Sequence, residues 1–234
     1  MTAERETKAA RTRSAIIDAA LTLFRERGYD ATTMRAVAAQ AGVSVGNAYY
    51  YFASKEALVQ GFYDRAQVEV MAVARPLLDG ERDLAARIAI LLEAWLTAMA
   101  PYHPFAGKFF KNAAEPTSPL SPFSPESAPA RDAAVAFWRE VVEGSDARIP
   151  KRLRAELPEL LWLYHMGIVL LWVYDRSPDV AVTRRVVRHS APVLVRAIAL
   201  SRLRVVGGLL DDTLAVLADV RRAFYAAARY EEEP

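Results

Sequence analysis

Helical periodicity is the feature that most constrains what this chain can fold into. Between residues 8 and 27, Ile16, Ala20 and Phe24 recur at spacings of four and form one apolar stripe. Similar spacings of three and four continue along most of the chain. No segment shows the sustained alternation of apolar and polar residues that is typical of a half-buried strand. We therefore predict an all-α fold.

Glycine and capping residues divide the periodic regions into separate helices. Gly28 is expected to end the first helix, since glycine is common just past a helix C-terminus. Asp30, Thr32 and Thr33 carry side-chain oxygens that can cap a second helix, and Ser54 can cap a long helix that runs to about residue 78. Further helices are predicted over residues 130–143, 158–174, 178–202 and 209–230.

Prolines concentrate in the middle of the chain. Seven of the 13 prolines lie between Pro101 and Pro129, and the last five of these come every three or four residues. Proline lacks an amide hydrogen and fixes its own φ, so a regular helix cannot form through such a run. We expect an extended or mobile loop at about residues 113–129. A proline-rich docking motif is the alternative.

Composition excludes several classes of protein. The chain has 234 residues, 53% of them hydrophobic, which is ample for a core, and its net charge of +2 is too small to indicate a nucleic-acid partner. The absence of cysteine excludes disulfides and thiolate chemistry. The longest apolar stretch, residues 160–174, is shorter than the roughly 20 residues of a membrane span. We therefore expect a soluble, cytoplasmic protein with no membrane partner.

One stretch carries a recognisable motif. Residues 32–58 read TTMRAVAAQAGVSVGNAYYYFASKEAL. Two short helices joined by a turn at Gly42 fit a helix-turn-helix over residues 32–51, in which the second helix enters the DNA major groove. Val37 and Ala38 are small enough for the two helices to cross closely, and Gly42 can take the positive φ that the turn needs.

This region resembles the tetracycline-repressor (TetR) family. The resemblance covers roughly residues 10–60, and it implies a homodimeric transcription regulator, usually a repressor, that a small ligand releases from a near-palindromic DNA operator. We expect a DNA-binding domain over residues 1–53 and a helical effector-binding and dimerisation domain over residues 54–234. The matching positions are Ala19-Ala20-Leu21, Phe24, Gly28-Tyr29, Thr32-Thr33, Ala38, Ala41-Gly42-Val43-Ser44, Tyr49-Tyr50-Tyr51-Phe52 and Ser54-Lys55-Glu56-Ala57-Leu58.

The resemblance also implies individual DNA contacts. It places Tyr49 and Lys55 on phosphates, Tyr51 on the DNA backbone or base edges, and Thr33 at a position that both caps a helix and contacts phosphate. Arg35 matches a position that often contacts a guanine. The side-chain chemistry agrees, because Arg35 can present a bidentate fork to guanine O6 and N7, and Lys55 lies near a helix N-terminus.

The first residues of the recognition helix should face base edges. These are Ser44, Val45, Gly46 and Asn47, of which Asn47 is the best candidate for direct base readout. Val45 and Gly46 have no hydrogen-bonding side chain. Part of the sequence preference is therefore expected to come from DNA shape.

Some neighbouring side chains have two interpretations. Tyr50 and Phe52 are expected to be core aromatics that brace the recognition helix, with a DNA contact by Tyr50 as the alternative. Thr32 either contacts DNA or only caps a helix. The basic residues at the N-terminus, such as Arg13, either reach DNA as an arm or belong to a solvated tail.

Aromatic residues concentrate between residues 84 and 174. A pocket lined by aromatic rings suits a small lipophilic or aromatic ligand, and the alternative is that the rings only fill the core. His165 lies on an otherwise apolar helix and needs a partner there. The three histidines lie on separate segments without ligand spacing, so we expect no metal and no other cofactor. The candidate ligand-binding residues are Trp95, Phe109, Trp138, Trp162 and His165.

The helices predicted over residues 158–174 and 178–202 have more apolar surface than one small domain readily buries. The resemblance implies that they pair with their twofold mates in a four-helix bundle. Such a dimer presents two recognition helices about 34–36 Å apart to successive major grooves. The candidate interface residues are Leu161, Ile168, Trp172, Val186, Val193, Leu194 and Ala197.

Two other functions remain open at this point. One is a DNA-binding activator, or another regulator without a small-molecule effector, in which the aromatic rings are only core. The other is an enzyme or carrier that contains a helix-turn-helix. Because the sequence shows no nucleophile and base at catalytic spacing and no glycine-rich phosphate loop, we expect that the protein is not an enzyme.

Overall fold

The computed structural model describes residues 8–115 and 118–201, together with residues 208, 212, 214–219 and 222. Every regular element in these residues is a helix, which confirms the predicted all-α fold. Short 3₁₀ turns, Ala100–Tyr102 and Pro178–Val180, precede α6 and α9. The helices are α1 (Lys8–Arg27), α2 (Met34–Gln40), α3 (Val45–Tyr51), α4 (Lys55–Leu78), α5 (Leu84–Met99), α6 (His103–Ala113), α7 (Ala128–Glu143), α8 (Lys151–Tyr174) and α9 (Ala181–Leu200).

Local signals set the ends of the first four helices as predicted. Gly28 follows α1 with φ +86°, and its N–H donates to the Phe24 carbonyl at 3.0 Å. The hydroxyls of Thr33 and Ser54 accept backbone N–H groups in the first turns of α2 and α4, at 3.2 Å each. These caps satisfy amides that have no partner inside the helix.

The later helices depart from the predicted bounds. α8 begins at Lys151 rather than at Pro158, because Leu153 and Leu157 are buried and stabilise two turns ahead of the proline. α9 begins at Ala181, after two residues with positive φ, Asp179 and Val180. The predicted helix over residues 209–230 lies mostly outside the described residues.

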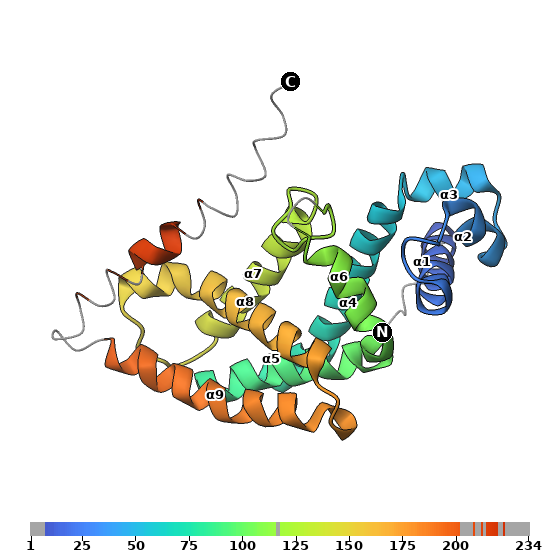
Figure 1. Cartoon of the computed structure of the whole chain (residues 1–234). Helices are drawn as coiled ribbons and strands as arrows, with labels where there is room; N and C mark the ends of the chain where they lie inside the picture. Colours follow the sequence, from blue (N-terminus) through green and yellow to red (C-terminus); the bar gives the residue numbers. More distant parts are fainter. Residues whose placement is uncertain are drawn as a thin grey trace.

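The helices enclose two hydrophobic cores. One core joins α1, α2 and α3 to the first turn of α4 through Leu58 and Val59. The other contains the rest of α4, including Val70 and Ala74, together with α5 to α9. Figure 1 shows α1–α3 at one end of the molecule, with α4 leading from them into the helical bundle. α4 therefore belongs to both cores and connects them.

Two segments are long and apolar enough to cross a membrane, namely Leu84–Tyr102 and Lys151–Tyr174. The helical segment at α8 is therefore longer than the apolar stretch seen in the sequence. By length and composition alone this is weak evidence for a membrane-spanning helix, because core helices of soluble proteins pass the same test. Leu92 of α5 and Leu161 of α8 have no exposed surface, which fits helices in the centre of a folded domain.

Candidate DNA interface and effector domain

The recognition helix α3 is held against α2 by small side chains. Ala48 has no exposed surface, and it packs in one core with Val37 and Ala38 of α2. Gly42 takes φ +66° in the turn between the helices, as its place in the motif predicts. The Ser44 hydroxyl caps α3 by accepting the Asn47 N–H at 3.1 Å. The burial of Ala48 therefore determines which face of α3 points away from the domain.

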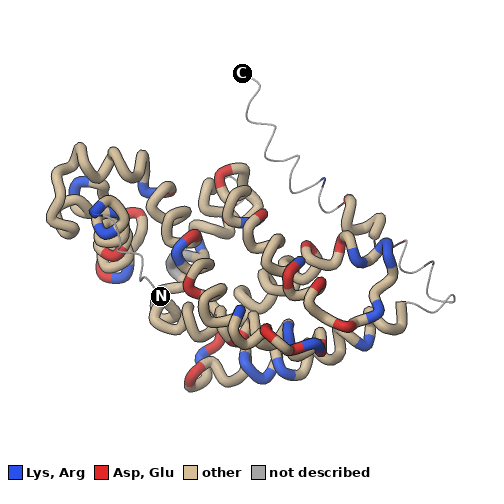
Figure 2. Tube along the Cα trace, turned by 180° about the vertical axis from the view of Figure 1, so that it is seen from behind, with Lys and Arg blue, Asp and Glu red and all other residues tan. Residues whose placement is uncertain are grey.

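That outer face is exposed and uncharged. Tyr49 is 51% exposed and Tyr50 is 82% exposed, and Ser44, Gly46 and Asn47 are exposed beside them. α3 carries no Lys, Arg, Asp or Glu (Figure 2). Such a surface presents hydroxyl and amide groups without a negative charge that would repel DNA phosphates.

The exposure of Tyr50 overturns the expectation that it is a core aromatic. Its ring contacts only the edge of Tyr51 among the ring pairs in the described residues, at a centroid distance of 5.3 Å. Ala48 and Phe52 lie four residues apart on the buried face, so Tyr50 points to the opposite side of the helix. The core position of Phe52, which is 3% exposed, is confirmed.

Thr32 and Thr33 have different roles. Thr32 is 1% exposed, and its hydroxyl donates to the Gly28 carbonyl at 2.8 Å. It is therefore part of the domain core and offers no atom to DNA, which corrects its assignment as a contact residue. Thr33 and Arg35 are exposed at the N-terminus of α2. Free backbone N–H groups at such a helix end favour a bound phosphate.

Lys55 is held in place by the preceding loop. Its Nζ donates to the Tyr29 carbonyl at 3.0 Å and lies 4.4 Å from the centre of the Tyr29 ring. The Tyr29 hydroxyl donates to Glu56 Oε1 at 2.6 Å. Burial and the Glu56 carboxylate raise the pKa of Tyr29, so the hydroxyl keeps its proton. An ammonium has three N–H groups, so Lys55 can still donate outward from this position.

Arg13, one of the candidate arm residues, contacts the domain itself. Its guanidinium lies 5.0 Å from the centre of the Phe52 ring and 3.7 Å from an oxygen of Asp64. The residues that precede Lys8 lie outside the described part of the chain. Arg13 therefore links α1 to α4.

The structure brings three of the five candidate ligand residues together. The ring centre of His165 lies 5.0 Å from that of Trp95 and 6.0 Å from that of Trp138. Trp162 packs instead against Phe123, with ring centres 5.4 Å apart. The side chain of Phe109 lies outside the described residues. Sequence reasoning missed Trp172 as a member of this aromatic cluster, because it was assigned to an interface.

Two nitrogen atoms in this cluster have no partner among the described residues. They are Nε2 of His165 and Nε1 of Trp172, which are buried and make no hydrogen bond there. Burial lowers the pKa of His165 to about 4, so its ring is neutral at pH 7. The cluster therefore contains polar atoms but no charge from this histidine.

Part of the predicted dimer surface is already buried within one chain. Leu161, Ile168 and Trp172 are 0%, 3% and 4% exposed, so they cannot reach a second copy, and their assignment as interface residues is corrected. Other helices of the same chain cover this face of α8, whereas Leu170 and Tyr174 of α8 are 44% and 68% exposed. On α9, Val193 is 61% exposed and Ala197 is exposed, with Val186 and Leu194 half-buried.

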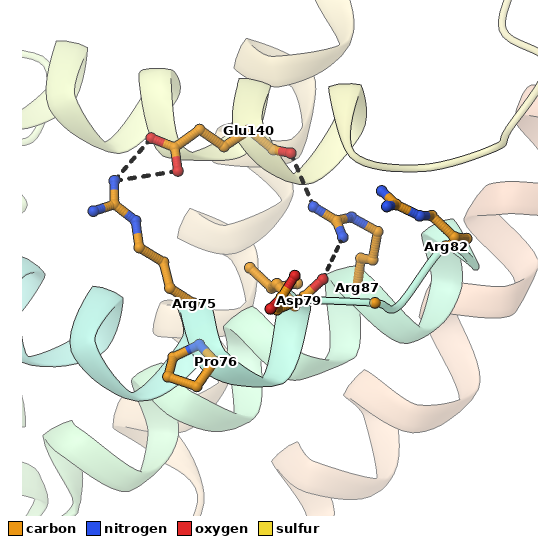
Figure 3. A pocket seen from close by; sticks show the side chains of 8 residues that line it. Arg75, Pro76, Asp79, Arg82, Arg87 and Glu140 are labelled. Atoms are coloured by element: carbon orange, nitrogen blue, oxygen red, sulfur yellow. Dashed lines mark hydrogen bonds and ion pairs between the residues drawn. The ribbon is translucent and has the colours of Figure 1, made fainter.

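A buried arginine fixes the far end of α4 (Figure 3). Arg87 donates to the carbonyls of Leu78 and Glu81 and, across to α7, to those of Glu140 and Val141, at 2.7–3.0 Å. Arg75 of α4 pairs with the Glu140 carboxylate at 3.0 Å. These bonds satisfy carbonyls at two helix C-termini, so α4 is anchored at this end. The one feature of the sequence that could have indicated this anchor is an arginine inside an apolar helix.

Two family profiles match the chain. Residues 16–61 match the profile described as bacterial regulatory proteins, tetR family, and residues 87–215 match the tetracyclin repressor-like C-terminal domain. The second match alone covers more than half of the chain. The chain belongs to the TetR family. It is therefore a helix-turn-helix transcriptional regulator rather than an enzyme.

The curated relatives match about a third of the chain. The chain is 35% identical over 75 residues to the transcriptional regulator UidR of Escherichia coli K12, which is 32% of this chain and 38% of UidR. It is 37% identical over 86 residues to the transcriptional repressor KstR2 of Rhodococcus jostii RHA1, which is 35% of this chain and 42% of KstR2. The chain thus spans less than half the length of these relatives.

Solved structures of TetR-family regulators share most of the fold. The chain is similar to a putative regulator from Syntrophomonas wolfei, with a TM-score of 0.64, 18% identity, and 79% of this chain and 95% of that chain covered. It is also similar to FadR of Thermus thermophilus, a repressor solved in complex with lauroyl-CoA. That comparison has a TM-score of 0.56 and 23% identity and covers 78% of this chain and 92% of that chain.

Proposed function

We propose that the protein is a homodimeric repressor that binds a near-palindromic operator and is released by a small, mainly apolar ligand. The observation that carries the DNA-binding part is the outer face of α3, which is exposed, uncharged and held by a buried Ala48. A relative that is named a repressor, KstR2, supports the direction of regulation. A regulator of this kind acts in the cytoplasm.

The proposed contacts divide into two groups. Arg35 and the N-terminal residues of α3, above all Asn47, contact base edges, and Ser44, Val45 and Gly46 let the helix approach the groove closely. Phosphates are contacted by Thr33, Tyr49 and Lys55. Tyr50 and Tyr51 extend this surface along the DNA backbone, since Tyr50 is the most exposed aromatic ring of α3.

The dimer is proposed to form through α9. Val193 and Ala197 lie on its outer face, and Val186 and Leu194 lie half-buried beside them. An exposed valine at such a position favours contact with the same surface of a second copy. A twofold dimer would set the two α3 helices about 34–36 Å apart, which matches successive major grooves.

The effector is proposed to bind among the rings of α5, α7 and α8 and to act on α4. α4 belongs to both hydrophobic cores, so a ligand that shifts it changes the orientation of α1–α3. FadR, a protein of similar fold, was solved in complex with lauroyl-CoA, which supports a ligand with a long apolar chain. A regulator without an effector is the second candidate, and the edge-to-face packing of Trp95 with His165 favours it, since these rings already fill space.

The test is a selection of bound fragments from genomic DNA with the purified full chain at near-physiological salt. We expect one near-palindromic sequence to be enriched, with half-sites one helical turn or a multiple of it apart. Salt-sensitive binding without enrichment would contradict the proposal, provided that mass spectrometry of the denatured protein finds no bound small molecule. An Arg139→Ala variant is the matched control, because Arg139 is exposed on α7, outside the proposed interface.

A further inference from the structure

Four aromatic rings from three helices meet inside the effector domain. Trp95 of α5 packs edge-on against His165 and Trp172 of α8, with ring centres 5.0 and 5.1 Å away. Trp138 of α7 packs against His165 from a third helix. We call these four residues the aromatic cluster.

The aromatic cluster contains two polar atoms that nothing in the described chain satisfies. Nε2 of His165 and Nε1 of Trp172 are buried and have no hydrogen-bond partner. Buried polar atoms are almost always paired in folded proteins, because leaving them unpaired costs free energy. An indole N–H can only donate, whereas a neutral imidazole nitrogen either donates or accepts.

The spacing of the two atoms limits what can satisfy them. His165 and Trp172 are seven residues apart on α8, which is about two helical turns and a rise of about 10 Å. They lie on the same side of α8, because both rings contact Trp95. A molecule that reaches both atoms must therefore be elongated and must lie along α8.

The surroundings also limit its charge. Within the described residues, no lysine or arginine lies over any of the four rings. The ring of His103 packs against Trp172, with ring centres 4.9 Å apart, and its Nε2 is already within hydrogen-bond distance of the Trp172 carbonyl, at 2.8 Å. A carboxylate or an ammonium group buried here would lose its hydration without gaining an opposite charge. Uncharged ligands are favoured for this reason.

We propose that the aromatic cluster binds an elongated, uncharged and mostly apolar ligand, with an acceptor oxygen for Trp172 Nε1 and a second polar group for His165 Nε2. This rests on the proposed function, since it specifies the chemical class of the effector. It differs from a general apolar pocket in one respect. The two unpaired nitrogens select for oxygen-bearing neutral molecules.

The test uses four probes with the same ten-carbon chain: 1,10-decanediol, 1-decanol, decanoate and decylamine. Binding to the full chain is followed by tryptophan fluorescence at pH 8, without DNA. We expect the diol to bind most tightly, and both charged probes to bind at least tenfold more weakly than it does. Equal or tighter binding of either charged probe, or no binding of the diol up to its solubility limit, would overturn the proposal.

Trp172→Phe tests the predicted hydrogen bond. It should weaken binding of the diol at least fivefold, because it removes the donor and keeps an aromatic ring. Tyr174→Phe is the matched control and should change the affinity less than twofold, because Tyr174 is 68% exposed on the same helix and lies outside the aromatic cluster. An unchanged affinity of Trp172→Phe for the diol, or an equal loss in the two variants, would contradict the predicted hydrogen bond.

A spectroscopic measurement on the unmodified protein does not depend on how the variants fold. In a ¹H–¹⁵N spectrum, the Trp172 indole resonance should move downfield when the diol binds, as expected for a new hydrogen bond. An unchanged indole resonance at saturation would contradict the proposal. These experiments contain no DNA, so a negative result would contradict the proposed ligand but not the proposed operator binding. A negative result in the fragment selection would contradict operator binding but not the ligand.

Discussion

Leu120 and Phe123 are three residues apart in the chain, yet they pack in two different hydrophobic cores. Leu120 is 1% exposed and belongs to the core of α1–α3, whereas the Phe123 ring packs against Trp162 in the other core. Gln60 of α4 fixes the same segment by donating to the Ser127 hydroxyl at 2.8 Å and to the Pro119 carbonyl at 3.2 Å. The segment between α6 and α7 is therefore a second connection between the cores, beside α4.

Leu120→Ala should destabilise α1–α3, although Leu120 lies more than 60 residues away from them in sequence. Removal of a buried leucine side chain typically lowers the free energy of unfolding by about 2–5 kcal/mol. Urea unfolding measures the loss, and hydrogen exchange should locate it in α1–α3. Leu77→Ala is the control, because Leu77 is 57% exposed on α4 and should change stability by less than about 0.5 kcal/mol. Unchanged exchange in α1–α3 would contradict this role of Leu120.

Gly144→Ala should disturb the anchor of α4. A Cβ atom at position 144 would lie 2.1 Å from Nη2 of Arg87, so the guanidinium must move away from the carbonyls that it binds. We expect a loss of about 1–3 kcal/mol in the free energy of unfolding.

Gly107→Ala is the matched control for Gly144→Ala. Gly107 lies within α6, and nothing is within 4 Å of a Cβ atom built there. Because alanine favours a helix over glycine, this variant should be stabilised by about 0.5–1 kcal/mol. Thermal unfolding measures the Tm of both variants. Equal Tm values would contradict the prediction that a side chain at position 144 displaces the Arg87 guanidinium.

His165 should make the protein less stable as the pH falls from about 6.5 to 4. Burial lowers its folded-state pKa to about 4, whereas the unfolded chain binds a proton near the ordinary value of about 6.5. The unfolded state therefore takes up more protons in this window, and stability falls by up to about 3 kcal/mol. Above pH 6.5 the side chain is neutral in both states and contributes no slope.

His165→Phe isolates this effect from other titrating groups. The free energy of unfolding of the wild type minus that of the variant should fall as the pH is lowered from 7 to 4, because only the wild type loses stability through His165. Urea unfolding at each pH measures this difference. Glu56 also has a lowered pKa, because hydrogen bonds from Tyr29 and Ser54 outweigh the opposing effect of burial, but its contribution cancels in this difference. A difference that does not vary with pH would contradict a buried, neutral His165.

Val193→Arg should convert the dimer to a monomer. Val193 is 61% exposed on α9, and an arginine there would place like charges together at a twofold contact. Val68→Arg is the control, because Val68 is 66% exposed on α4, away from the proposed interface. Sedimentation velocity at micromolar concentration should show a monomer only for Val193→Arg. A wild type that is itself monomeric would contradict the dimer.

The sequence was sufficient where the signals were local. Gly28, Ser44 and Ser54 mark helix ends through their own conformation and hydrogen bonds, so α1–α4 could be predicted closely. The start of α8 was missed because Leu153 and Leu157 are stabilised by contacts with distant helices, which outweigh the proline signal at Pro158.

Tertiary contacts also explain the errors at individual residues. Tyr50 was expected in the core, but the burial of Ala48 sets the rotation of α3 and turns Tyr50 outward. Trp172 was assigned to an interface because the helix predicted over residues 158–174 is apolar on all sides, and the sequence does not tell which helices cover each side. Nothing in a proline-rich segment indicated that Leu120 would enter the core of α1–α3.

The most direct test of the central claim, that the outer face of α3 and the start of α2 bind DNA, is an affinity measurement on the selected operator. Fluorescence anisotropy at fixed salt compares the wild type with Tyr49→Ala, Arg35→Ala and the control Arg139→Ala. Tyr49→Ala should weaken binding to every DNA sequence alike, and Arg35→Ala should cost about 1–3 kcal/mol and relax the preference at one base pair in each half-site. Arg139→Ala should bind as the wild type does. If Tyr49→Ala and Arg35→Ala also bound with unchanged affinity and sequence preference, the account of this interface would be wrong.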